Sequence, residues 1–294
     1  MTLVAEDLSY RHAGALRPTL RGINLSLADG EVVGVVGANE SGKSTLCLVL
    51  SGLAPRVVGG QLAGRLLIDG EDVAALPPHR LAGRVGIVFD DPGTQLSGVA
   101  ATVYEEVAFG PSNLAVGRAE LIERTEWALD LLDIRALAGR DPARLSGGQQ
   151  QLVAIASILA MRPRHLVLDE PTAQLDPAGT ALVGAALQRL AASGVSVLLV
   201  EHKTDLVERL ASRVLVLDGG RVALEGPAGD VLADPRLPGL GVAPPAQIRL
   251  RNRLADAGLE SPALLEAIAA AAAASTSASA PQGPASAASA GGPA

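Results

Sequence analysis

The chain has 294 residues, a length that suits one large domain or two small ones and can bury a sizeable core. Its 24 Lys and Arg against 31 Asp and Glu give a formal net charge of −7, which argues against a nucleic-acid partner because such proteins need a basic surface. The single cysteine, Cys47, excludes a disulfide framework and a cysteine-rich metal site.

Short runs rich in Val and Leu predict the strands of a parallel β-sheet. Each run is apolar on both sides of the strand alternation, as in strands that are buried on both faces of a sheet. In chain order they occupy residues 31–37, 84–89, 165–169, 195–200 and 213–217.

Helical patterns alternate with these strands and predict a doubly wound α/β domain. They occupy residues 43–53, 120–132, 147–160, 179–192 and 206–211. The segment from about residue 95 to residue 161 contains two of these helices and no convincing strand. It therefore reads as a helical insertion into the α/β core.

The pattern weakens after about residue 235, where one amphipathic helix is predicted at 246–257. Residues 267–294 carry no charge and consist of Ala, Ser, Gly and Pro, with Ile268, Thr276 and Gln282 as the exceptions. We expect this tail to be disordered, because it cannot bury enough apolar surface to offset the entropy of ordering it. Its alanines also account for part of the 48% hydrophobic content.

The mean hydropathy of +0.31 raises the question of a membrane span. No run of eighteen apolar residues is free of Gly, Pro and charge, whereas a spanning helix needs about 20 such residues. The opening segment MTLVAEDLSYRH places acidic residues where a signal peptide has basic and then apolar ones. We expect a cytosolic protein that is soluble or is held at the membrane by a partner.

The segment GANESGKS at 37–44 follows a predicted strand and precedes a predicted helix, which is the context of a phosphate-binding loop. Backbone N–H groups and the helix N-terminus there attract a phosphate. In this motif Gly42 permits close approach, Lys43 reaches the β- and γ-phosphates, and the Ser44 hydroxyl ligates Mg²⁺. The motif alone leaves kinases, GTPases and ATPases open. The predicted nucleotide-binding residues are Gly37, Ala38, Asn39, Glu40, Ser41, Gly42, Lys43, Ser44 and Thr45.

The run HLVLDE at 165–170 is an apolar strand that ends in two acids. Asp169 is expected at the C-terminal edge of the sheet, beside a Mg²⁺ ion held by Ser44. Glu170 can then point at the water that attacks the γ-phosphate. A buried strand that merely ends in solvated acids is the alternative.

The segment LSGGQ at 145–149 opens a predicted helix with a Ser N-cap and two glycines, which makes a second anion site. One phosphate loop cannot also fold back onto this site, so ATP is expected between two subunits. Here the sequence resembles the ABC transporter ATPase family, whose signature is LSGGQ, over about residues 1–230. The signature residues that would bind nucleotide are Ser146, Gly147, Gly148 and Gln149.

The resemblance implies the fold and several further roles. The expected fold is a P-loop NTPase (RecA-like) α/β core with a parallel sheet, an N-terminal antiparallel β subdomain and an inserted α-helical subdomain. Leu175 and Asp176 match the D-loop, which communicates across the dimer in this family. His202 matches the switch histidine at the γ-phosphate, since an imidazole can steady developing phosphate charge. The predicted catalytic residues are Glu170, His202 and Lys43.

The sequence departs from the family at two positions. The family's Q-loop Gln is replaced by Asp90, which could ligate Mg²⁺ together with Ser44 and Asp169 but adds negative charge. Gln95 could replace the missing amide. The adenine-stacking aromatic aligns with His12, whereas Tyr10 is expected to be a packing residue.

Within the family, segments 91–96 (DPGTQL) and 101–111 (ATVYEEVAFGP) resemble the ATPases of energy-coupling-factor (ECF) transporters, which import vitamins and cobalt or nickel. The resemblance implies that residues 103–111 lie at the face that grips membrane coupling helices. For Tyr104 and Phe109, two of the chain's few aromatics, ordinary packing and a contact role stay equally open. The implied partners are a second ATPase subunit, a transmembrane coupling subunit and a substrate-binding membrane subunit.

The leading hypothesis is therefore the ATP- and Mg²⁺-dependent ATPase of an ECF-type importer at the cytoplasmic face of the cell membrane. The alternatives are the ATPase of another ABC transporter, a hydrolysis-impaired regulatory half of a heterodimer, and a non-transport ABC protein. The last needs tandem cassettes or coiled coils, whereas this chain has one set of motifs. The expected domains are an ATPase domain at 1–230 with the helical subdomain at about 95–161, a small extension at 231–266 and the tail at 267–294. The transported substrate, and the choice between homodimer and heterodimer, are left open.

Overall fold

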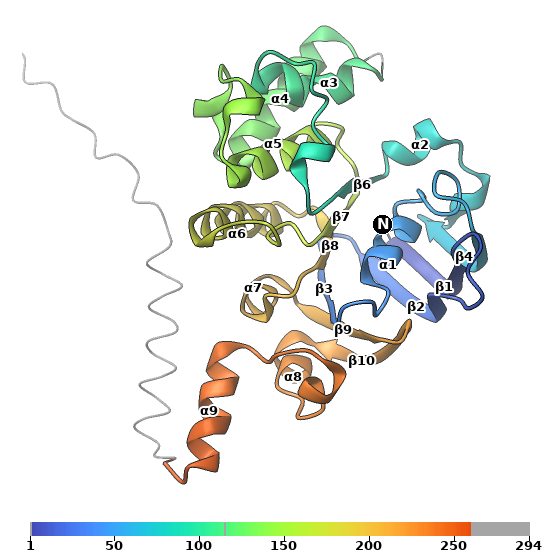
Figure 1. Ribbon diagram of the computed structural model, residues 1–294. Helices are drawn as coiled ribbons and strands as arrows, with labels where there is room; N and C mark the ends of the chain where they lie inside the picture. Colours follow the sequence, from blue (N-terminus) through green and yellow to red (C-terminus); the bar gives the residue numbers. More distant parts are fainter. Residues whose placement is uncertain (1, 115, 260–294) are drawn as a thin grey trace, which may run out of the picture. The chain divides into compact units, whose positions relative to one another are not determined.

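The computed structural model describes residues 2–114 and 116–259, and the chain divides into two units, Met1–Pro245 and Ala246–Ala294 (Figure 1). In the second unit, helix α9 (Ala246–Asp256) confirms the helix predicted at 246–257. The tail predicted at 267–294 lies outside the described residues. None of the described helices combines the length and the apolar character that crossing a membrane requires.

A six-stranded sheet with the order β10-β9-β3-β8-β7-β6 forms the centre of the first unit. Five of its strands run parallel and confirm the five predicted strands. The sixth, β10, pairs with β9 in the antiparallel sense. The strands are β3 (Val32–Gly37), β6 (Val85–Val88), β7 (His165–Asp169), β8 (Ser196–Val200), β9 (Arg213–Asp218) and β10 (Arg221–Pro227).

A second, antiparallel sheet with the order β2-β1-β4-β5 confirms the N-terminal β subdomain. Its inward side chains alternate along β1 until the register shifts between Ala5 and Leu8, where Asp7 has a φ of +48°. The shift keeps Leu8 and Tyr10 on the buried face. The strands are β1 (Thr2–Arg11), β2 (Leu20–Ala28), β4 (Gln61–Ile68) and β5 (Glu71–Asp72).

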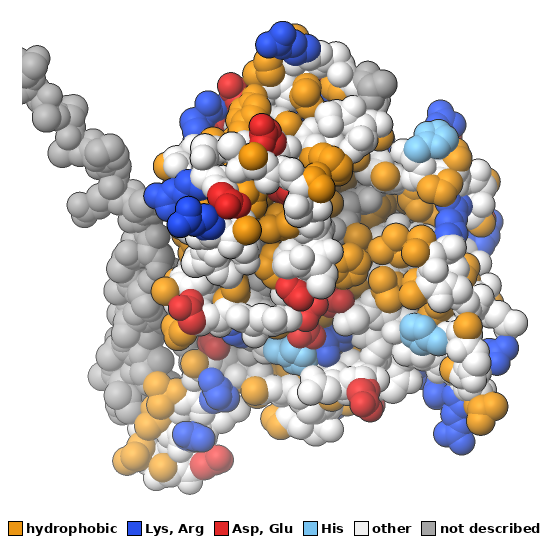
Figure 2. Space-filling view, turned by 45° about the horizontal axis from the view of Figure 1, so that its top comes forward, with side chains coloured by type: hydrophobic (Ala, Val, Ile, Leu, Met, Phe, Trp, Pro, Cys, Tyr) orange, Lys and Arg blue, Asp and Glu red, His pale blue; other side chains and the backbone are white. Residues whose placement is uncertain are grey.

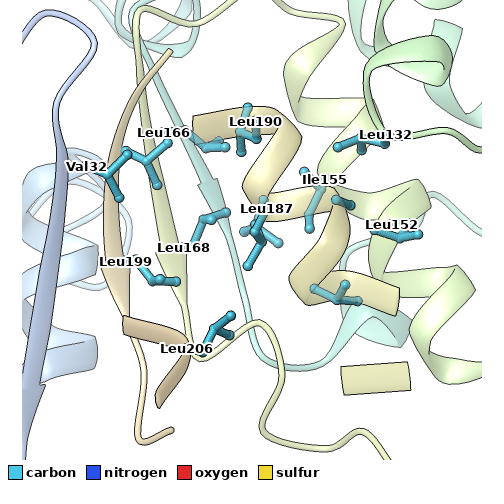
Figure 3. Close-up of a cluster of buried hydrophobic side chains, with 14 of the residues drawn as sticks. Val32, Leu132, Leu152, Ile155, Leu166, Leu168, Leu187, Leu190, Leu199 and Leu206 are labelled. Carbon is cyan, nitrogen blue, oxygen red and sulfur yellow. The ribbon is translucent and has the colours of Figure 1, made fainter. Parts of the chain in front are cut away.

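Both faces of the six-stranded sheet are covered, which explains why its strands are apolar on both sides. Val33 and Val35 of β3 pack with helix α1 and the antiparallel sheet. Val32 and Val36 point to the opposite face, where Leu187 and its neighbours pack against the sheet (Figure 3). This arrangement confirms the doubly wound α/β fold. The covering helices are α1 (Lys43–Leu50), α5 (Gly147–Leu159), α6 (Pro177–Ala192), α7 (Thr204–Leu210) and α8 (Ala228–Leu232).

The segment between β6 and β7 is helical, but the prediction of two helices there was wrong. It contains three α-helices, α3 (Val103–Ser112), α4 (Arg118–Leu131) and α5. The sequence pattern misses α3 because Gly110 and Pro111 fall in its last turn. Gly110 lies against the side chain of Met161, just after α5, and a Cβ there would be 2.6 Å from Met161 Sδ, so that this side chain would have to move. A capping box between Thr102 and Glu105 begins the helix.

The remaining elements are short, and one predicted helix is shorter than expected. The helix predicted at 43–53 ends at Leu50, because the chain turns at Gly52 with a φ of +73°. The short helices are α2 (Pro78–Ala82) and the 3₁₀ turns η1 (Val73–Ala75), η2 (Pro92–Thr94), η3 (Arg135–Leu137), η4 (Pro142–Arg144) and η5 (Leu237–Leu240).

Candidate active site

The loop between β3 and α1 wraps around the ammonium group of Lys43. Lys43 Nζ donates hydrogen bonds to the carbonyl oxygens of Gly37 (3.1 Å) and Ala38 (3.0 Å). Burial lowers the pKa of Lys43, and the carboxylates of Glu170 and Asp169 oppose that shift. Gly42, immediately before α1, has a φ of +106°, a conformation that favours glycine. The loop therefore places the Lys43 ammonium group next to the N-terminus of α1.

This loop opens into a pocket of about 370 Å³. Its walls come from the phosphate-binding loop, the start of α1, the end of β7 and the segment before β2. The lining residues are Thr19, Asn39, Glu40, Gly42, Lys43, Ser44, Thr45 and Glu170. Six of the nine nucleotide-binding residues predicted at 37–45 therefore line the pocket. The volume of the pocket suits a group of phosphate size or larger.

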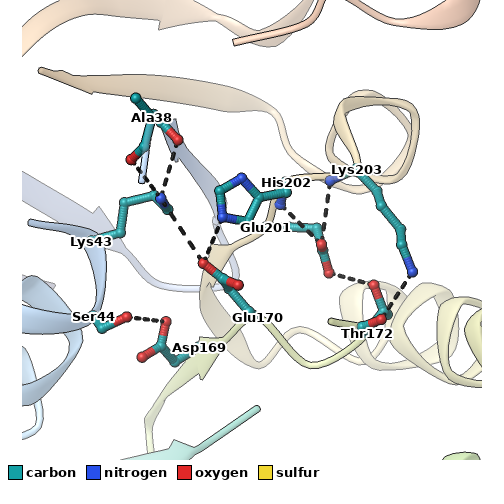
Figure 4. Close-up of polar contacts among 10 residues, drawn as sticks. Ala38, Lys43, Ser44, Asp169, Glu170, Thr172, Glu201, His202 and Lys203 are labelled. Atoms are coloured by element: carbon teal, nitrogen blue, oxygen red, sulfur yellow. Dashed lines mark hydrogen bonds and ion pairs between the residues drawn. The ribbon is translucent and has the colours of Figure 1, made fainter. Parts of the chain in front are cut away.

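Asp169 lies beside Ser44, as the strand pattern predicts. The Ser44 hydroxyl donates to Asp169 Oδ1 at 3.2 Å (Figure 4). Burial and the neighbouring Glu170 and Asp90 carboxylates raise the pKa of Asp169 to about 6, against the opposing effect of the Ser44 hydrogen bond and Lys43. A hydroxyl and a carboxylate are hard oxygen donors of the kind that Mg²⁺ shares with nucleotide phosphates and water. The pair therefore fits the predicted Mg²⁺ ion. The described residues contain no cluster of three or more His, Cys, Asp or Glu that could hold a metal ion.

Glu170 and His202 face each other across the ends of β7 and β8. Glu170 Oε1 lies 2.9 Å from His202 Nε2 and 3.9 Å from Lys43 Nζ (Figure 4). Glu170 has a φ of +50°, an uncommon conformation for a residue other than Gly and one that often marks functional positions. The structure therefore brings all three predicted catalytic residues together.

Asp90 lies two residues beyond the end of β6, close enough to Asp169 for its carboxylate to raise the Asp169 pKa. Its carboxylate is exposed and accepts a hydrogen bond from Gln174 Nε2 at 3.2 Å. Gln95 has both ends of its amide engaged, because Oε1 accepts from the Phe89 N–H (3.0 Å) and Nε2 donates to the Ile87 carbonyl (2.9 Å). Gln95 therefore holds the end of β6 in place, and its amide is not free to replace the missing Q-loop amide. The amide that lies beside Asp90 is that of Gln174.

His12 lies next to the helix that follows the phosphate-binding loop. Its Nε2 is 3.2 Å from Thr45 Oγ1, and its ring meets the ring of Tyr10 edge-on at 4.9 Å between centroids. Tyr10 is fully buried and donates to the Gly59 carbonyl at 2.6 Å, which confirms it as a packing residue. His12 is half-buried and is not among the residues that line the pocket.

The four signature residues form the N-terminus of α5. Ser146 is the N-cap, and its side chain and that of Gln149 bond reciprocally to each other's backbone N–H in a capping box. Ser146 and Gly147 are exposed, whereas Gly148 is buried against Gly179 of α6. None of the four lines the pocket at the phosphate-binding loop of the same chain.

The D-loop residues lie beside the signature. Asp176 is the N-cap of α6, and its Oδ1 accepts from the Gly179 N–H at 2.7 Å. A Cβ on Gly147 would touch Leu175 Cδ2 at 3.5 Å. The first turns of α5 and α6 therefore form one packed unit.

The stretch at 103–111 combines buried and exposed roles. Glu106 is 4% exposed, and its carboxylate accepts from Ser97 N (2.7 Å) and Ser97 Oγ (2.6 Å). Tyr104 packs partly against the core, whereas Phe109 is 44% exposed. Tyr104 therefore has a packing role, and Phe109 is on the surface.

Sequence reasoning missed several polar residues that organise the site. Gln174, Glu201 and Lys203 make contacts between segments far apart in the chain, and Glu106 binds Ser97, nine positions before it. Among these four, only Glu201 carries a local signal, because it is an acid directly after the apolar run VLLV that ends β8. The partners of the others cannot be read from spacing.

Comparisons with known proteins identify the family of the chain. The family model described as ABC transporter matches residues 20–173. A Pyrococcus horikoshii protein that carries the name of an ABC transporter ATP-binding protein is 40% identical over 88% of this chain and 92% of its own length. The energy-coupling factor transporter ATP-binding protein EcfA of Methanosarcina acetivorans is 39% identical over 87% of this chain and 91% of its own. The structure of CbiO1 from Clostridium perfringens, part of the ABC transporter complex CbiONQ, matches with a TM-score of 0.70 at 34% identity, covering 79% of this chain and 90% of that one.

Proposed function

Because the chain belongs to the ABC transporter family and is its ATP-hydrolysing subunit, we propose that it powers an ECF-type importer of a vitamin or transition-metal ion. The observation that carries this proposal is the similarity to EcfA along nearly the whole of that protein. The similarity to CbiO1 and the stretch at 103–111 support it.

Residues around the pocket divide the work of binding and hydrolysis. The loop N–H groups and Lys43 bind the β- and γ-phosphates, with the phosphate oxygens replacing the carbonyls of Gly37 and Ala38 as partners of Nζ. Glu170 orients or deprotonates the attacking water, and His202 holds the Glu170 carboxylate and steadies the developing charge. Positioned charges of this kind lower a phosphoryl-transfer barrier by several kcal/mol.

Mg²⁺ would be held by Ser44 and Asp169, with Asp90 close enough to act on Asp169. When bound, the ion neutralises charge on the phosphate oxygens. Besides burial, the Glu170 and Asp90 carboxylates raise the pKa of Asp169, and a cation beside Asp169 would offset this repulsion.

A second ATPase subunit, identical or related, completes the site. Ser146 and Gly147 are exposed at a helix N-terminus and do not line their own chain's pocket. Such a helix end is suited to bind the phosphates held by another subunit. ATP would then lie between one subunit's phosphate-binding loop and the other's signature.

The membrane partners would dock on an apolar groove of about 230 Å³ between the end of α1, α2 and the last turn of α5. Its wall includes Val57, which is 77% exposed. Figure 2 shows hydrophobic side chains gathered to the right of the centre of one face, with acidic and His side chains below them. Pulling on this groove would move β6, whose Ile87 lines the groove and whose last residue is followed closely by Asp90.

The test is purification of the tagged full-length chain from its own cell membranes, with mass spectrometry of the proteins that accompany it. We expect a transmembrane coupling subunit and a small substrate-binding membrane protein. Val57→Asp should remove both, whereas Leu182→Asp, at a 41% exposed apolar side chain of α6, should retain them. Accompanying proteins of an exporter, or of the translation machinery, would contradict the ECF assignment.

Asp90 supports a second candidate, the hydrolysis-impaired half of a heterodimer. An extra carboxylate at this edge adds repulsion toward the γ-phosphate. The intact arrangement of Glu170, His202 and Lys43 favours an active subunit instead.

A further inference from the structure

We propose that Glu201 and Lys203, the two neighbours of His202, form a clamp that positions the His202 imidazole on Glu170. They are positioning residues, and the inference rests on the proposed hydrolysis at Glu170. The clamp joins the end of β8 to the segment that follows β7 (Figure 4). It also joins this end to the first turn of α6.

Glu201 forms the buried half of the clamp. It is 1% exposed, so its carboxylate needs donors to offset the loss of water. Three groups supply them, the Thr172 hydroxyl (2.7 Å), the His202 N–H (2.9 Å) and the Lys203 N–H (3.3 Å). Because two of these donors are successive backbone groups, Glu201 fixes the turn that carries His202 out of β8.

Lys203 forms the other half. Its Nζ donates to the Thr172 carbonyl (2.9 Å) and to Thr180 Oγ1 (2.8 Å). Thr172 is fully buried and is therefore held at its hydroxyl by Glu201 and at its carbonyl by Lys203. Hydrogen bonds to charged groups are about twice as strong as neutral ones, so both tethers resist displacement.

The clamp acts on both sides of the hydrolytic pair. On one side it sets the backbone of His202, whose Nε2 reaches Glu170 at 2.9 Å. On the other side it holds Thr172, which follows Glu170 by two residues. Glu170 itself is tied to β8 by the bond from its N–H to the Val200 carbonyl (3.0 Å). The geometry of the His202–Glu170 contact is thereby determined from both ends.

The clamp also reaches the signature. The Thr180 hydroxyl that accepts from Lys203 donates to the Leu175 carbonyl at 3.4 Å, and the first turn of α6 packs against Gly148. A displacement of His202 would therefore change the packing of the N-terminus of α5, which is proposed to bind the ATP of the opposite subunit.

The kinetic test compares variants of the full-length ATPase. Lys203→Met and Thr172→Val should each lower kcat for ATP hydrolysis by about tenfold with little change in KM, because they disturb an arrangement used in the reaction step. Lys203→Arg should recover part of the loss, since it restores a charged donor. Thr204→Val is the matched control, because it removes a buried hydroxyl that bonds to Ala243 next to Lys203 but outside the clamp. It should leave kcat unchanged, and unchanged kcat in Lys203→Met would overturn the clamp.

A spectroscopic test separates positioning from a general loss of structure. The chain has four His, so the ring resonances can be assigned by single substitutions. Lys203→Met should shift the His202 ring signals and leave those of His79, on α2, in place. An unmoved His202 signal would refute the clamp even if the ATPase activity of the wild-type chain supports the proposed function. If the wild-type chain does not hydrolyse ATP, a His202 shift would still support the clamp while the proposed function fails.

Discussion

Gly148 gives the sharpest test of the packing that carries the signature. A Cβ at this position would lie 2.8 Å from Gly179 Cα and 3.4 Å from the Gly179 carbonyl oxygen. Carbon atoms normally pack at about 3.5–4.0 Å, so Gly148→Ala must separate two backbones by roughly 0.7 Å or more. Neither neighbour is a flexible side chain that could move aside.

Overpacking of this kind costs about 1–3 kcal/mol, while replacing Gly by Ala inside a helix returns about 0.5–1 kcal/mol. Gly147→Ala is the matched control, because its Cβ would touch only Leu175 Cδ2, at an ordinary 3.5 Å. We expect Gly148→Ala to be less stable than Gly147→Ala by about 1–3 kcal/mol, a difference of several degrees in Tm for a domain of this size. The assay is urea or thermal unfolding followed by circular dichroism. Equal stability of the two variants would refute the close approach of α5 and α6.

Two further predictions concern Asp90 and His165. Asp90→Gln should keep or raise the rate of ATP hydrolysis in a steady-state assay, because it removes a negative charge near Asp169; complete loss would show that the carboxylate has a specialised role. His165 is fully buried with neither ring nitrogen hydrogen-bonded, and burial lowers its pKa below 6.5 against the opposing Asp69 and Asp29 carboxylates. Below pH 6.5, His165 therefore binds a proton more readily in the unfolded chain than in the folded one. The free energy of unfolding that depends on a neutral His165 is complete above pH 6.5 and falls as the pH drops below it, by up to about 1.4 kcal/mol per pH unit. His165→Leu should remove that slope in urea unfolding between pH 7 and pH 5, and parallel pH profiles of the two proteins would contradict the prediction.

The central strands could be predicted because burial on both faces leaves a strong local mark. Val32 to Val36 alternate between the α1 face and the α6 face of the sheet, so every position is apolar. Helix α3 could not be predicted in the same way, because its last turn contains Gly110 and Pro111 and its packing partner Met161 is far along the chain.

In the site, too, residues with a local sequence pattern could be predicted, whereas residues that depend on distant contacts could not. The phosphate-binding loop, Asp169 and Glu170 are recognisable because their chemistry depends on neighbours in the sequence. The role of Gln95 cannot be recognised in this way, because both ends of its amide form hydrogen bonds with the backbone of Ile87 and Phe89. Likewise Glu201 and Thr172 are 29 positions apart, and only the pairing of β7 with β8 brings them together.

In the proposed function, Glu170 activates the attacking water in a pocket that a second subunit closes. Glu170→Gln keeps the size of the side chain and removes its charge, so hydrolysis should fall by about 10²–10⁴-fold while ATP binding persists. The most direct measurement is the mass of this variant by light scattering with ATP and Mg²⁺, beside its rate of phosphate release. We expect a stable dimer whose rate of phosphate release is lowered by this factor. A Glu170→Gln variant that hydrolyses ATP at the wild-type rate would contradict it.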